Sequence, residues 1–139
     1  MDDPYNLNRF LSAQAPVIEQ VRAELRAGCK HGHWMWFVFP QIAGLGHSDM
    51  ARRFAIASLD EARAYAAHEI LGPRLIECAA LVAQVEGRSI EEIFGSPDDL
   101  KFRSSMTLFA RAAPQEQVFK DALQKYFGGE VDWATVERI

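Results

Sequence analysis

Side chains that could do chemistry concentrate in two stretches of the chain. In the first, His31 and His33 run directly into the aromatic segment 34–39. If this segment is helical, Trp34 and Trp36 point about 200° apart, so one can face the core while the other stacks on a flat ligand beside His33. The alternative is that every aromatic side chain here packs into the core, because large apolar side chains gain most free energy from burial.

The second stretch is SPDDLKFRSSMTLF. On a helix its polar side would carry Asp98, Lys101, Ser104 and Ser105, with Arg103 at the border. An acid, an amine and two hydroxyls beside apolar surface can bind a small polar ligand. The alternative is structural: the acids satisfy the start of a helix, the lysine is solvated, and the small serines let a neighbouring helix approach closely.

Neither stretch carries the pattern of a known reaction. A serine nucleophile would need His33 as its base and Asp98 as the acid that orients it, but no Gly-x-Ser-x-Gly turn is present. His31 and His33 would share one face of an extended segment, but only His47 and Asp98 are loose candidates for a further metal ligand. We predict no metal and no cofactor, and keep His33 and Asp98 as the catalytic candidates for any acid–base step.

Composition limits the class of protein. A net charge of −4 over 139 residues argues against a nucleic-acid or anionic-membrane partner, which would need a basic surface. The longest apolar run, residues 34–39, is far shorter than the roughly 20 residues of a membrane span. Cys29 and Cys78 match no metal or redox spacing and are expected to be free thiols. We therefore predict a cytoplasmic protein, and leave its oligomeric state open.

Periodicity and helix-end signals predict an all-α fold, a single domain over residues 1–139 with about seven helices. The expected helical segments are 16–28, 48–56, 60–68, 73–85, 96–112 and 115–127, with a short turn from Ser89 to Gly95. Segment 73–85 is apolar almost all round, which is typical of a central helix. Segment 34–39 is expected to be a short buried helix or an extended connector. Two acid-first pairs, Glu116–Lys120 and Asp121–Lys125, should stabilise the last helix.

Four motifs carry a resemblance to a known family: DPYNLNRF, HWMWFVFPQIAGLG, HEILGPRL and FGSPDDLKFRSSMTLF. From Asp3 to about Gly129 the chain resembles the bacterial domain-of-unknown-function family 1810, whose members often carry the label "calpastatin". Glu69 and Phe102 stand where that family usually has proline and leucine. The resemblance implies a mainly helical domain with no established activity. A calpastatin-like inhibitor is a disordered chain of low hydrophobicity, whereas 49% hydrophobic residues indicate a prefolded globule.

These observations favour a binding domain for a polar or nucleotide-like metabolite, with or without catalysis. The candidate ligand-binding residues are Trp34, Trp36, Arg74, Lys101, Arg103, Ser104 and Ser105. A tryptophan would stack on the ligand, Lys101 and Arg74 would neutralise charge, and His33 or Asp98 would move protons. The alternative is an interaction or scaffold domain that works through an exposed apolar patch. The two stretches must meet around an open hollow for the first hypothesis to hold.

Overall fold

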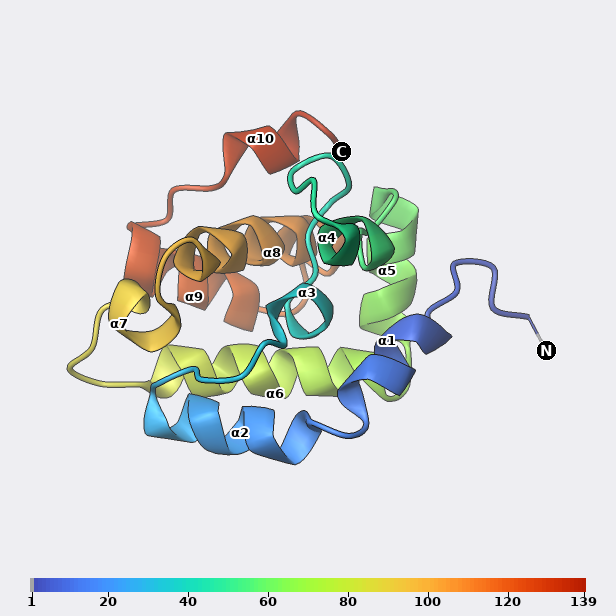
Figure 1. Ribbon diagram of the computed structural model, residues 1–139. Coiled ribbons are helices and arrows are strands. Elements are labelled where there is room, and N and C mark those ends of the chain that lie inside the picture. Colours follow the sequence, from blue (N-terminus) through green and yellow to red (C-terminus); the bar gives the residue numbers. More distant parts are fainter. Residues whose placement is uncertain (1) are drawn as a thin grey trace.

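The computed structural model describes residues 2–139, and ten α-helices make up most of that region (Figure 1). They are α1 (Asn8–Gln14), α2 (Ile18–Ala27), α3 (Met35–Val38), α4 (Asp49–Arg53), α5 (Leu59–Ala67), α6 (Leu71–Gln84), α7 (Ile90–Phe94), α8 (Asp98–Ala112), α9 (Val118–Phe127) and α10 (Trp133–Val136). Within residues 2–139 the only β-pairing is one parallel bridge between Ile42 and Ile56. The predicted all-α class is confirmed, and no helix of the described region is long and apolar enough to cross a membrane.

Helices α1 and α10 were not predicted, and α3 settles the aromatic segment as a short helix. The expected count of about seven was therefore too low. Both unpredicted helices are short, and an isolated helix of this length is unstable in water without contacts from elsewhere. At α1 those contacts come from Asp3, whose carboxylate accepts hydrogen bonds from the backbone N–H groups of Leu7 and Asn8 at 2.8 and 3.0 Å.

Several helix ends follow their local signals. Ser48 caps α4, its hydroxyl accepting from the Ala51 N–H, and Ser89 forms a capping box at α7. Gly28 ends α2 with a φ of 71°, a left-handed conformation that glycine adopts without a steric cost. The predicted continuation of α4 to residue 56 is wrong, because Ile56 pairs with the loop after α3.

Other predicted ends are wrong. Ser96 was expected to cap α8, but Pro97 occupies the cap position, so Ser96 lies outside the helix and makes no capping bond. Ser58, not Asp60, caps α5. The Asp121–Lys125 pair does not form, because the Lys125 ammonium instead donates to the backbone carbonyls of Ala83 and Val85 at the C-terminal end of α6, at 2.7 and 2.6 Å, and lies 3.4 Å from the Glu86 carboxylate. Exposed acid–lysine pairs contribute little, so a carbonyl cluster competes effectively for the lysine.

The helices form successive layers, with α2, then α6, then α8 and α9, then α10 (Figure 1). Helix α6 packs against α2, α5 and α9, as expected for a segment that is apolar almost all round. Helix α8 contacts α5, α7, α9 and α10. These two helices therefore organise the core.

Aromatic rings connect the first predicted stretch to the second. Phe39, at the end of α3, presents its ring at right angles to Phe102 of α8, with centroids 5.0 Å apart. Phe94 of α7 stacks on Phe102, also at 5.0 Å, and lies 5.9 Å from Phe39. Edge-to-face and offset contacts of this kind add to the free energy gained by burial. They hold the aromatic segment against the start of α8.

A buried ion pair fixes the loop that follows α4. Glu61 of α5 has a side chain only 4% exposed, and its carboxylate lies 2.8 Å from the guanidinium of Arg9. That guanidinium donates five hydrogen bonds, to Glu61 and to the carbonyls of Tyr5, Asn6, Arg53 and Ala55. Because every strong donor has an acceptor, the cost of burying the pair is offset.

Candidate functional site

Asp98 joins the two predicted stretches. Its carboxylate lies 3.0 Å from the Lys30 ammonium, which precedes the histidines, and 3.4 Å from the Lys101 ammonium on the next turn of α8. The backbone N–H of Lys30 also donates to the Ile93 carbonyl at the end of α7, at 2.8 Å. The chain before the aromatic segment is thus attached to both helices at this corner.

A buried carboxylate shapes the turn that carries the histidines. One oxygen of Glu24 accepts from the backbone N–H groups of His31 and Gly32 and from the Trp34 indole N–H, at 2.8 to 2.9 Å. The other oxygen accepts from Gln20 at 2.7 Å. Burial raises the pKa of Glu24, but these hydrogen bonds outweigh it and lower the pKa to about 2. Glu24 is therefore ionised and fully used in positioning the turn.

The two tryptophans have different surroundings. Trp34 is 1% exposed, with its N–H taken by Glu24, so it is a core residue and cannot stack on a ligand. Trp36 is half-buried and lines a narrow recess, and the Lys101 ammonium lies 5.4 Å from its ring centroid. That distance suits a cation–π contact. His33 is exposed and makes no hydrogen bond within residues 2–139.

An open hollow of about 350 Å³, here called the Lys101 hollow, lies beside this recess. Its walls come from the loop after the aromatic segment, the start of α8 and the start of α10, with lining residues Gln41, Leu45, Gly46, Pro97, Leu100, Lys101, Ser104, Asp132 and Ala134. The recess and the hollow share Gln41 and Gly46. In Figure 1 the loop before α4 and helix α10 lie together over α8.

Hydrogen bonds hold the α10 wall of the Lys101 hollow in place. One oxygen of Asp132 accepts from the hydroxyls of Ser104 and Thr135, at 2.7 and 2.6 Å. The Asp132 N–H in turn donates to the Thr107 hydroxyl at 2.9 Å. Burial raises the pKa of Asp132, yet the hydrogen bonds from Thr135 and Ser104 bring it below its ordinary value of 3.8. The hollow therefore presents a carboxylate as well as an ammonium.

A family model described as "Protein of unknown function (DUF1810)" matches residues 4–139. The chain belongs to this family. It is also similar to the crystal structure of the conserved hypothetical protein Rv1873 from Mycobacterium tuberculosis, with 63% sequence identity and a TM-score of 0.96, over 97% of this chain and 96% of that one. No curated protein matches. The DUF1810 resemblance of the four motifs is confirmed, and no activity comes with it.

Besides Trp34 and Trp36, three further predicted ligand-binding residues of this DUF1810 chain lie outside the Lys101 hollow. Arg74 contacts the Gln14 side chain at 3.3 Å, and its helix α6 begins beside α5, away from α7 and the start of α8 (Figure 1). Arg103 donates to the Val131 carbonyl at 3.1 Å and so secures the C-terminal segment. Ser105 is fully buried, with no partner for its hydroxyl within residues 2–139. Lys101 and Ser104 are the predicted residues that line the hollow.

Asp132 is the functional candidate that sequence reasoning missed. Its position directly before a short helix is a common start signal, which could have drawn attention to it. Its contact with Ser104, 28 residues away in the chain, cannot be predicted from the local sequence. No group of three or more His, Cys, Asp or Glu side chains that could hold a metal ion occurs in the described part of the chain.

Proposed function

We propose that the chain is a binding domain for a small polar metabolite, held in the Lys101 hollow. The observation that carries the proposal is that the loop after the aromatic segment and the start of α8 form walls of one open hollow. Its volume of about 350 Å³ falls within the range of small-molecule pockets. The polar groups, Lys101, Ser104 and Asp132, converge from two helices onto this space.

The charges of the hollow favour a ligand without net charge. Lys101 and Asp132 are the two ionised side chains of the lining, and they balance each other. A ligand that donates to the carboxylate and accepts from the ammonium satisfies both, whereas a phosphate would meet the repulsion of Asp132. Leu45 and Leu100 add apolar surface at the same place. We therefore favour a nucleoside-like or other uncharged polar compound over a nucleotide.

The geometry supports binding better than catalysis. Asp98 is ion-paired with two lysines, so it is poorly placed to exchange protons with a substrate. His33 is exposed and does not line the hollow. Ser104 donates to a carboxylate rather than to a base, and no histidine contacts it. None of the sequence-predicted catalytic candidates is thus arranged for reaction at this site.

An interaction domain is the second candidate function. Leu100 is 54% exposed and Trp133 is 59% exposed, and both belong to segments that form this hollow. Exposed large apolar side chains beside a concave surface also suit a protein partner. A partner would cover the rim of the hollow and leave its polar groups without a specific ligand.

Thermal unfolding of the full chain with a panel of nucleosides, nucleotides, sugars and amino acids tests the proposal. A compound at one hundred times its Kd raises the free energy of unfolding by about 2.7 kcal/mol, which is easily measured. We expect Lys101→Gln to weaken that compound's binding about tenfold, or about 1.4 kcal/mol. Arg26→Gln makes the same charge change on an exposed side chain of α2 and should leave binding unchanged. A panel without any effect, or equal effects in both variants, contradicts the metabolite site and favours the interaction domain.

A further inference from the structure

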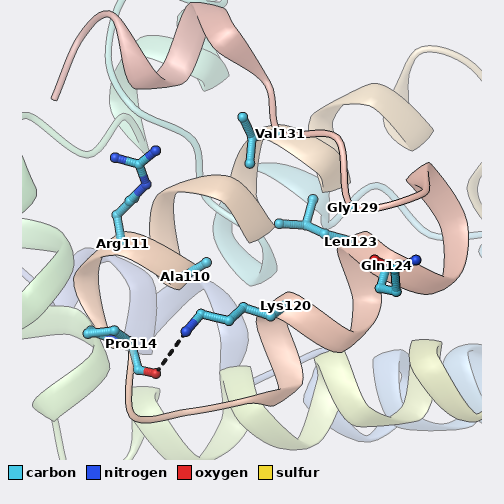
Figure 2. A pocket seen from close by; sticks show the side chains of 8 residues that line it. All are labelled: Ala110, Arg111, Pro114, Lys120, Leu123, Gln124, Gly129 and Val131. Carbon is cyan, nitrogen blue, oxygen red and sulfur yellow. Dashed lines mark hydrogen bonds between the residues drawn. The ribbon is translucent and has the colours of Figure 1, made fainter.

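A second hollow lies where α8 ends and α9 begins, and it is here called the Lys120 hollow (Figure 2). It has a volume of about 430 Å³, again within the range of ligand pockets. The lining residues are Ala110, Arg111, Pro114, Lys120, Leu123, Gln124, Gly129 and Val131. None of them belongs to the Lys101 hollow.

Both charged side chains of this lining are cations, and neither is neutralised. Arg111 makes no hydrogen bond or ion pair within residues 2–139. The sequence predicted a Glu116–Lys120 pair, but that prediction is wrong: the Lys120 ammonium lies instead 3.4 Å from the Pro114 carbonyl oxygen, inside the hollow. On a chain of net charge −4, this hollow therefore presents two positive charges and no carboxylate.

The hollow has a charged side and an apolar side. In Figure 2 the Lys120 ammonium points toward Pro114 and the Arg111 guanidinium points away from it; both lie on one side of the space, whereas Leu123 lies on the other. Leu123 is only 4% exposed, so its side chain forms a floor continuous with the core. Val131 closes the hollow from above (Figure 2). A ligand can thus place an anionic group at one end and bury an apolar body at the other.

The wall that follows α9 is held in place. Gly128 ends α9 in a left-handed conformation, and the Gly129 N–H donates to the Leu123 carbonyl at 3.0 Å. Arg103 then holds the Val131 carbonyl from α8 at 3.1 Å. Gly129 has a φ of 82°, a left-handed conformation that glycine adopts without a steric cost. These bonds make the hollow a built feature of the fold.

We infer that the Lys120 hollow binds a small organic anion: a carboxylate or phosphate monoester that carries a short aliphatic or aromatic body. An arginine guanidinium can hold either head group with two parallel hydrogen bonds, and the Lys120 ammonium adds positive charge to the same lining. A neutral ligand would leave both cations without a negatively charged partner. Nucleic acid would require a longer series of phosphate contacts than two side chains provide. This site is independent of the metabolite proposed for the Lys101 hollow.

The test uses three probes on the full chain: phenylbutyrate, its uncharged amide phenylbutyramide, and phenyl phosphate. Binding is followed by backbone amide shifts in two-dimensional NMR spectra. We expect the anions to shift the amides of Ala110, Leu123, Gly129 and Val131, and the uncharged amide to bind at least about tenfold more weakly. Added salt should weaken the binding of both anions but not that of phenylbutyramide. The tighter of the two anions identifies the head group.

Two variants assign the effect to the cations. Arg111→Gln and Lys120→Gln should each weaken binding of the tighter anion about tenfold, while Arg26→Gln leaves it unchanged. Both lining cations are exposed, so the variants should fold, and unchanged amide spectra elsewhere verify this. The inference is overturned if phenylbutyramide binds as tightly as phenylbutyrate, if neither lining variant weakens binding, or if no probe shifts these amides. Because the two hollows share no lining residue and are tested with different compounds and variants, failure here leaves the Lys101 hollow untouched.

Discussion

Replacing Glu24 by glutamine removes the negative charge at the centre of the turn that carries His31 and Trp34. Its carboxylate accepts three N–H groups at one oxygen and one at the other, and only 9% of the residue is exposed. Glutamine keeps the shape and can present one oxygen to the three donors. What it loses is the strength that ionisation gives to those hydrogen bonds, together with the bond from the Gln20 amide nitrogen, which would face the NH2 group of the new side chain.

The size and sign of the effect follow from the pKa. Four hydrogen bonds outweigh the burial that raises the pKa of Glu24, and lower it from 4.5 to about 2, which corresponds to about 3 kcal/mol of stabilisation of the ionised form. This stabilisation is complete above pH 4.5 and is lost as the pH falls through about 2. We therefore expect Glu24→Gln to be about 3 kcal/mol less stable near neutral pH. By about pH 3 the difference should shrink by about 2 kcal/mol.

Urea unfolding followed by circular dichroism, at several values between neutral pH and about pH 3, measures this difference. Both proteins should show the same dependence of stability on urea, so that the midpoints report stability alone. Glu137→Gln is the control, because its side chain is exposed and makes no hydrogen bond or ion pair within residues 2–139. A stability difference for Glu24→Gln that does not change with pH would refute the electrostatic account.

Three other perturbations have definite expected outcomes. Gly72→Ala should lower the free energy of unfolding by more than about 3 kcal/mol, because the added Cβ would lie 2.2 Å from the backbone carbonyl oxygen of Ala66. Thermal unfolding measures this, and a variant as stable as the parent protein contradicts it. Arg9→Lys should lower the free energy of unfolding, measured in urea, by about 2 kcal/mol, because an ammonium cannot make the five hydrogen bonds of the guanidinium. An unchanged stability would show that the positive charge alone is sufficient. Burial raises the pKa of the Cys78 thiol to about 12, so a thiol reagent should modify Cys29 alone in the native protein, and rapid reaction of both thiols would contradict the structure.

Local sequence signals were sufficient where one chain segment decides its own structure. Ser48 and Ser89 cap the helices that follow them, and Gly28 ends α2, because each signal acts within a single turn. The aromatic segment does contact the start of α8, since large apolar side chains have few places to be buried in a small domain. The hollow at this place is lined by the loop after the segment and not by the segment itself.

Two residues of the same type can have different surroundings because of contacts with distant parts of the chain. A local sequence pattern does not predict those contacts. Helical spacing indicated that Trp34 and Trp36 face different ways, but Glu24, in the preceding helix, decides that Trp34 is the buried one. Ser104 and Ser105 are neighbours, yet Ser104 reaches Asp132 while Ser105 points into the core. In each case a partner far along the chain selects between two side chains that the sequence leaves equivalent.

The C-terminal segment after α9 connects the two proposed sites physically. Val131 covers the Lys120 hollow and the adjacent Asp132 lines the Lys101 hollow, so one short stretch of backbone forms a wall of each. Hydrogen bonds from Asp132 to Ser104 and Thr107 attach this segment to α8. Neither hollow would have this wall without the segment, and each presents a different charge pattern to solvent. The last residues of the chain, which had no predicted role, therefore contribute a wall to both of the sites at which we expect ligands to bind.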